Sequence, residues 1–121
     1  MTKQRDLVLR VLRESEGHMT AAQIYKNASE KMPGIAVGTV YRNLGILEQN
    51  HLISRFTMSD GTAIYDKTPT RHSHMICVKC RKITDIMDDS IISALEEKTS
   101  VKFLSVFMTA EYICDECAAK S

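Results

Sequence analysis

Four cysteines in two widely separated pairs constrain this chain more than any other feature. The pairs are Cys77-Val-Lys-Cys80 and Cys114-Asp-Glu-Cys117, and they contain every cysteine in the sequence. Each Cys-x-x-Cys spacing turns two thiolates to one side of a tight knuckle, and two knuckles complete the tetrahedral four-sulfur shell that zinc prefers. We therefore predict a structural zinc ion on Cys77, Cys80, Cys114 and Cys117 that closes a long loop of the chain.

Two disulfides, or a thioredoxin-like redox pair, would use the same cysteines. The sequence shows no signal peptide, and no apolar run approaches the roughly 20 residues of a membrane helix. Both observations predict a cytoplasmic protein without membrane contact, in which thiols stay reduced. A redox motif also needs only one cysteine pair, usually at the start of a helix. Zinc is therefore the preferred interpretation, and a thiol oxidoreductase is the alternative.

The N-terminal half has the pattern of a winged helix-turn-helix. Helical spacing of apolar residues, or a capping box, marks three helices: 4–14, the segment opened by Thr20 and Gln23, and 37–50. Residues 52–57 and 63–66, separated by an Asp-Gly turn, predict a β-hairpin. Three helices followed by a hairpin predict a DNA-binding domain over residues 1–66.

The third helix supplies the predicted DNA-reading surface. Val40, Leu44 and Leu47 form its buried stripe. The residues predicted to contact DNA lie away from that stripe: Thr39, Tyr41, Arg42 and Asn43. Arginine can bond guanine edges bidentately, and tyrosine can pack on thymine methyl groups or bond phosphate, so Tyr41 and Arg42 are the expected readers; a partly buried core position is the alternative for Tyr41. The formal net charge is only +1, so DNA contact must come from such a local cluster.

The C-terminal half has a different pattern. Residues 67–71 contain one proline and no periodicity, which predicts a hinge, and residues 72–121 predict a small α+β dimerisation and metal-binding domain. Its expected elements are strands over 74–77 and 82–86, a helix over 90–98 and a long strand over 101–113. Because that last strand has apolar residues on both faces, we expect it at a homodimer interface.

A second possible metal site consists of histidines and aspartates: His18, Asp66, His72, His74 and Asp85. Imidazole and carboxylate ligands without sulfur suit iron(II), manganese(II) or zinc. The spacing of His72 and His74 turns both rings to one side just before a strand. A lone His18 or Asp66, however, is most often a surface group, so spacing alone leaves this five-residue site open.

In the order of these motifs the chain resembles the ferric uptake regulator family. The resemblance rests on four features, in this order: Ala36-Val-Gly-Thr-Val-Tyr-Arg-Asn-Leu-Gly-Ile-Leu-Glu48, a hairpin ending in Tyr65-Asp66, His72-Ser-His-Met-Ile-Cys-Val-Lys-Cys80 followed by Asp85, and the second cysteine pair. It implies a winged-helix domain hinged to an α+β dimerisation domain with a four-cysteine zinc site. It also implies a regulatory iron(II) or manganese(II) ion at His18, Asp66, His72, His74 and Asp85.

The resemblance further implies a homodimeric, metal-dependent repressor that binds a double-stranded DNA operator of inverted-repeat form. Iron-uptake regulators tend to carry Glu at the positions of Asp66 and Asp85, whereas peroxide-responsive repressors carry Asp at both. The chain therefore looks like the peroxide-responsive subgroup, in which oxidation of an iron(II)-ligating histidine, here His18 or His72, destroys the site. The alternative is a metal-homeostasis regulator of the same family that senses iron, manganese or zinc supply.

Two further expectations concern what the chain lacks. No enzyme is predicted, because a metallohydrolase needs an open metal position beside a Glu base, and the sequence has no His-Glu-x-x-His motif. The recognition helix of the family commonly has a hydroxyl residue at its N-cap, where this chain has Ala36. We expect that cap to be missing, at a typical cost of ~1 kcal/mol.

Overall fold

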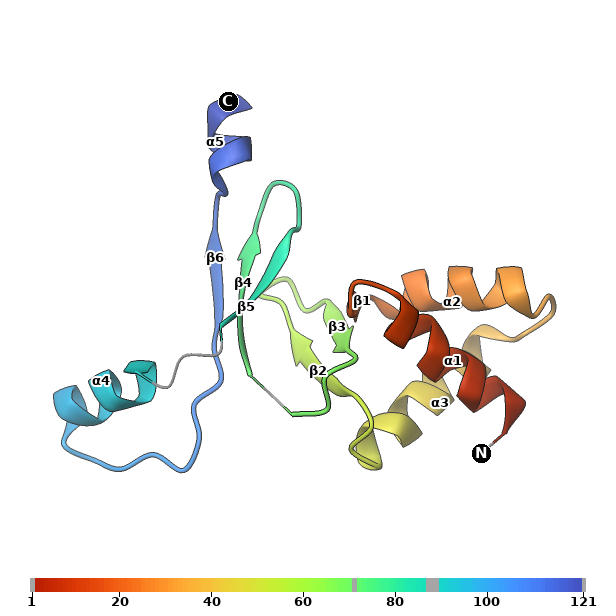
Figure 1. The fold of residues 1–121 in the computed structure, drawn as a ribbon, viewed down its shortest axis with the longest axis horizontal. Helices are drawn as coiled ribbons and strands as arrows, with labels where there is room; N and C mark the ends of the chain where they lie inside the picture. The colour runs from red at the N-terminus through yellow and green to blue at the C-terminus, as the bar shows by residue number, and fades with distance from the viewer. Residues whose placement is uncertain (1, 71, 87–89, 121) are drawn as a thin grey trace. The chain divides into compact units, whose positions relative to one another are not determined.

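The computed structural model describes residues 2–70, 72–86 and 90–120. The chain divides into two compact units, Met1–Arg71 and His72–Ser121, and each unit contains its own three-stranded sheet (Figure 1). The finer division into a domain over 1–66 and a hinge over 67–71 remains a prediction, and Arg71 lies outside the described residues.

Three helices begin the first unit: α1 Lys3–Glu14, α2 Ala21–Lys31 and α3 Val37–Gln49. The predicted capping box is present, since Thr20 accepts a hydrogen bond from the Gln23 N–H and the Gln23 side chain accepts one from the Thr20 N–H. Ala36 at the start of α3 makes no side-chain cap, as the sequence predicts. The helices therefore begin where local sequence signals place them.

The core of the first unit lies among these helices. Leu12, Ile24 and Leu44, one from each helix, are completely buried in a single apolar cluster. Full burial of a side chain of this kind contributes roughly 1.5–3 kcal/mol relative to exposure. This shared core holds α3 against α1 and α2 and leaves its opposite face available.

The sheet of the first unit contains a strand that the sequence does not predict. The expected hairpin is formed by β2 Ser54–Thr57 and β3 Ala63–Asp66, and the short strand β1 His18–Met19 pairs antiparallel with β3 on the other side. A strand of two residues is too short for an alternating pattern to be recognised. Its register sets His18 opposite Asp66.

The second unit is built on β4 Ser73–Cys77. β5 Ile83–Ile86 pairs with it antiparallel and β6 Thr109–Tyr112 pairs with it parallel, in the order β5-β4-β6. Two helices complete the unit, α4 Ser90–Thr99 and α5 Asp115–Lys120, of which α5 was not predicted. In Figure 1 β6 runs beside β4 and leads directly into α5. This pairing brings both cysteine pairs to one end of the sheet.

The predicted long strand over 101–113 is wrong in its extent. Only Thr109–Tyr112 form a strand, because β4 offers pairing partners only from His74 to Cys77 along this edge. Apolar side chains before β6 are instead exposed, and Leu104 is fully so. Among the described residues, no helix has the length and apolar character needed to cross a membrane.

Candidate metal centres and nucleic-acid interface

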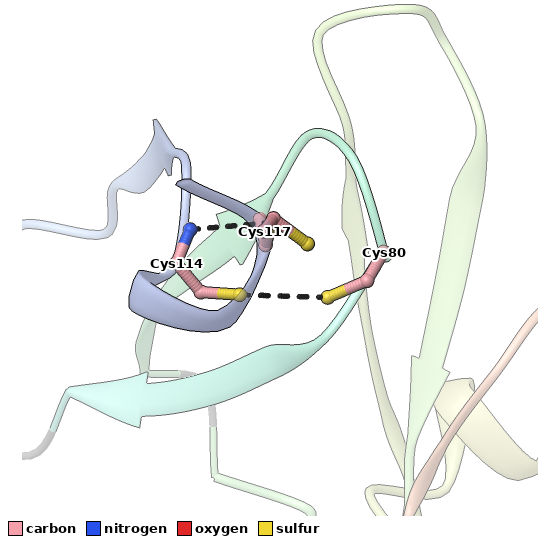
Figure 2. A group of neighbouring side chains, drawn as sticks. Cys80, Cys114 and Cys117 are labelled. Atoms are coloured by element: carbon pink, nitrogen blue, oxygen red, sulfur yellow. Dashed lines mark hydrogen bonds between the residues drawn. The ribbon is translucent and has the colours of Figure 1, made fainter. Parts of the chain in front are cut away.

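The four cysteines come together in the second unit. Cys77 ends β4 and Cys80 lies in the turn that follows, while Cys114 lies just before α5 and Cys117 lies within it. Their sulfur atoms all lie within 4.8 Å of one another, and Figure 2 shows the sulfurs of Cys80 and Cys114 facing each other at 3.8 Å. All four are free thiols, so the structure contains no disulfide at these positions.

The sulfur geometry fits a tetrahedral metal ion. Zinc–sulfur bonds of about 2.3 Å in a tetrahedron place the sulfurs about 3.8 Å apart, which matches the separation of Cys80 and Cys114. The Cys114 N–H donates a hydrogen bond to the Cys77 sulfur at 3.4 Å, and this bond, with others from the backbone, lowers the pKa of Cys77 to about 6. Hydrogen bonding to Cys114 and burial raise the pKa of Cys117 to about 12. A bound cation would stabilise all four thiolates together.

The first unit brings His18 and Asp66 together through the pairing of β1 with β3. His18 Nε2 lies 3.2 Å from Asp66 Oδ2, and the other carboxylate oxygen of Asp66 accepts a hydrogen bond from the Thr68 N–H at 2.8 Å. Asp66 is only 1% exposed, so it is not the surface group that its isolation in the sequence suggested. A buried carboxylate beside an imidazole is suited to binding a cation.

The second unit brings His72, His74 and Asp85 together. The antiparallel register of β4 and β5 sets His74 opposite Asp85. Asp85 Oδ1 lies 3.0 Å from His72 Nε2 and 3.4 Å from His74 Nε2, and the two imidazole rings are 4.3 Å apart between centroids. Each unit therefore holds its own group of nitrogen and oxygen donors without sulfur, which fits iron(II), manganese(II) or zinc.

The recognition surface of α3 differs from the sequence prediction at one residue. Tyr41 and Arg42 are exposed and Thr39 is half-buried, so the core interpretation of Tyr41 is wrong. Asn43 was predicted to lie away from the buried stripe, and this is also wrong: Asn43 is buried, and its Oδ1 accepts a hydrogen bond from Arg5 Nε at 3.2 Å. The reason is helical spacing, since position 43 follows Val40 by three residues and lies beside it.

Two residues that hold Asp66 were missed by the sequence analysis. The Thr68 N–H donates to the Asp66 carboxylate, and the Ser54 hydroxyl donates to the Thr68 carbonyl at 2.7 Å. An aspartate that accepts from the backbone two residues later is a known turn pattern, so Asp66-Lys-Thr68 carried a weak signal. Nothing local to Ser54 indicated its role.

Comparison with known proteins identifies a single family. The model of the "Ferric uptake regulator family" matches residues 1–111. The peroxide-responsive repressor of Staphylococcus epidermidis is 32% identical over 120 residues, covering 97% of this chain and 80% of that protein. The peroxide operon regulator of Bacillus subtilis is 32% identical over 123 residues, covering 99% and 85%.

Solved structures agree with this match. The ferric uptake regulator of Helicobacter pylori, described with three functional metal binding sites, has a TM-score of 0.84 at 30% identity and covers 98% of this chain and 81% of its own. The peroxide stress regulator of Campylobacter jejuni has a TM-score of 0.72 at 26% identity, with coverage of 94% and 88%. The Pseudomonas aeruginosa ferric uptake regulator with manganese has a TM-score of 0.72 at 25% identity, with coverage of 95% and 90%.

Proposed function

Since this chain belongs to the ferric uptake regulator family, whose members are DNA-binding transcription regulators and not enzymes, we propose that it is a metal-dependent repressor that senses peroxide. The observation that carries the proposal is the pair of His/Asp donor groups, one in each unit, with a largely buried carboxylate at Asp66. We place its action in the cytoplasm, where the chromosomal DNA would be its target.

The structural metal of this proposal is zinc on Cys77, Cys80, Cys114 and Cys117. These residues would hold the ion as thiolates, and the ion would join the turn after β4 to the start of α5. The four free sulfurs and their mutual separations support this assignment. In the second unit, where β6 pairs with β4, the zinc–sulfur bonds would then cross-link one end of the sheet.

The regulatory metal of this proposal is iron(II) or manganese(II). His18 and Asp66 would supply ligands from the first unit, and His72, His74 and Asp85 would supply them from the second. Because neither group alone provides five ligands, one shared ion would favour a particular angle between the units. Metal binding would thereby shift the population toward the geometry that binds DNA.

The DNA-binding part of this proposal uses α3. Tyr41 and Arg42 would contact the bases, with Thr39 beside them, while Asn43 would hold the helix against Arg5 instead of reading DNA. A two-fold symmetric dimer presents two such helices about one helical turn of DNA apart. We therefore expect an operator in the form of an inverted repeat.

The peroxide response of this proposal would require iron(II) held by the His and Asp ligands, which would activate hydrogen peroxide. One peroxide oxygen would pass to a histidine ring, which is oxidised by two electrons, and the other oxygen would leave as water. His18 and His72 are the expected sites of oxygen addition because of their positions in the resemblance to the peroxide-responsive repressors. Two observations support peroxide sensing over metal-supply sensing: the aspartates at positions 66 and 85, and the similarity to peroxide-responsive repressors. The second candidate, regulation by metal supply, is favoured by a donor set that fits manganese or zinc equally well.

The test is a DNA-binding titration of protein loaded with iron(II) or manganese(II), before and after low hydrogen peroxide. The iron form should leave the DNA and gain one oxygen on a peptide that contains His18 or His72, as read by mass spectrometry. The manganese form is the control and should stay bound. If the iron form also stays on DNA and gains no oxygen, the metal-supply function replaces peroxide sensing.

A further inference from the structure

The Asp66 carboxylate is held by a short chain of hydrogen bonds within the first unit. Asp66 Oδ1 accepts from the Thr68 N–H at 2.8 Å, and the Thr68 carbonyl accepts from the Ser54 hydroxyl at 2.7 Å. Ser54 lies opposite Asp66 in the register of β2 and β3 and is only 7% exposed. Because the hydroxyl is buried, solvent cannot readily take its place if it is removed.

Because of these hydrogen bonds, the two carboxylate oxygens of Asp66 have different partners. Oδ1 is turned to the Thr68 N–H, and Oδ2 lies 3.2 Å from His18 Nε2. Rotation of the carboxylate about its Cβ–Cγ bond would break the bond to Thr68. The arrangement therefore presents one oxygen, Oδ2, beside the His18 imidazole.

A second contact ties the same segment to Gly17, the residue before β1. The Lys67 N–H donates to the Gly17 carbonyl at 3.0 Å, and the Lys67 side chain crosses the face of Gly17, where a Cβ atom would lie 2.9 Å from Lys67 Cε. Gly17 also has a φ of +98°, which other residues rarely adopt. Residues 66–68 are therefore held on two sides, by Gly17 just before β1 and by Ser54 in β2.

We propose that Ser54 is a positioning residue for the regulatory metal. By holding the Thr68 peptide, its hydroxyl keeps Asp66 Oδ1 engaged and leaves Oδ2 to bind the ion beside His18. The inference rests on the proposed function, because it takes Asp66 as a metal ligand. Groups that orient a ligand in this way commonly change metal affinity about 10- to 100-fold when they are removed.

The test compares Ser54→Thr with Ser54→Val in the full-length, zinc-loaded protein. These variants add nearly the same bulk and differ in the hydroxyl group, so crowding effects cancel between them. Ser54→Thr should bind manganese(II) as the wild type does, and Ser54→Val should bind it about 10-fold more weakly. With cobalt(II) as a spectroscopic probe, only Ser54→Val should shift the ligand-field absorption bands, because the carboxylate then binds in a different mode.

A matched control removes a hydroxyl elsewhere. Ser29 Oγ donates to the Lys26 carbonyl at 2.8 Å in α2, so Ser29→Ala loses the same kind of bond away from Asp66 and should leave manganese affinity unchanged.

Asp66→Asn distinguishes a failure of the proposed ligand set from a failure of the proposed role of Ser54. If Asp66→Asn binds manganese(II) as the wild type does, the proposed ligand set fails. If Asp66→Asn weakens binding while Ser54→Val and Ser54→Thr agree in affinity and cobalt spectrum, the role of Ser54 is overturned and the function stands.

Discussion

At the scale of the residue, the candidate sites depend on short contacts between groups of different chemistry. Asp66 is almost fully buried between the His18 imidazole and the Thr68 peptide, and Cys77 receives a backbone hydrogen bond from Cys114. Buried charge of this kind is costly unless it is paired or coordinates a metal. Individual side chains should therefore have large effects on metal content and sensing.

The first residue-scale prediction concerns zinc. Cys77→Ser removes a buried ligand from the four-sulfur cluster, and hydroxyl oxygen is a poor replacement for thiolate. The variant should lose its zinc and, with it, either the dimer or the folded second unit. Metal analysis together with size-exclusion chromatography and light scattering measures both. Wild-type protein purified without zinc, with a stable Cys77→Ser dimer, would contradict the structural role.

The second residue-scale prediction concerns peroxide. Asp85 Oδ1 lies within 3.4 Å of both His72 and His74, so an added methylene in Asp85→Glu changes the reach and the mode of coordination. The variant should keep metal-dependent DNA binding but gain less oxygen on the peptides that contain His18 and His72. Oxygen incorporation at the wild-type level would show that Asp and Glu are interchangeable at this position.

At the scale of the element, α3 combines a buried face with an exposed one. Its buried face includes Asn43, which is joined to Arg5 of α1 by a hydrogen bond, and its exposed face includes Tyr41 and Arg42. Since Ala36 provides no cap, packing against α1 and α2 must stabilise this helix. Changes on the exposed face should therefore alter DNA binding without unfolding the unit.

Arg42→Ala tests this expectation. Loss of a bidentate contact to a guanine should weaken operator binding by about 1–3 kcal/mol, with zinc content and dimerisation unchanged. Gln49→Ala, at an exposed position at the end of the same helix, is the control and should bind like the wild type. A gel-shift titration gives both affinities. Equal affinity of Arg42→Ala and wild type for the operator would exclude this helix face as the reader.

At the scale of the whole molecule, each chain consists of two compact units. Members of its family act as dimers of two such chains. The second unit exposes apolar side chains in the segment before β6: Val101, Phe103, Leu104 and Phe107. Exposed apolar surface of this kind marks a contact site in many proteins. We therefore keep the 101–108 region as the predicted homodimer contact, although it is not the strand that the sequence indicated.

Leu104→Asp should weaken the dimer, because it places a charge in this apolar segment at a side chain that is fully exposed in the single chain. Val37→Asp introduces the same charge at another exposed apolar position, at the start of α3 in the first unit, and should remain dimeric. Sedimentation equilibrium measures the dissociation constants of both variants. A Leu104→Asp dimer as tight as that of Val37→Asp would place the interface elsewhere.

The sequence by itself determined the features that depend on local spacing. Helix boundaries follow from apolar stripes and from the Thr20 capping box, because capping and periodicity act within a few residues. The cysteine spacing indicated a four-sulfur cluster, and its sulfurs do lie together, because each knuckle is local and zinc demands four ligands.

Only the tertiary structure decided the features that require two distant segments to meet. Strand β1 exists because β3 pairs with it, β6 is short because β4 is short, and the Asn43 side chain has a hydrogen-bond partner because Arg5 reaches it across the helices. The orientation of Asp66 likewise depends on Ser54, a residue twelve positions earlier. Each of these outcomes is set by packing and hydrogen bonding between segments, and such partners leave no periodic signal in the sequence around either residue.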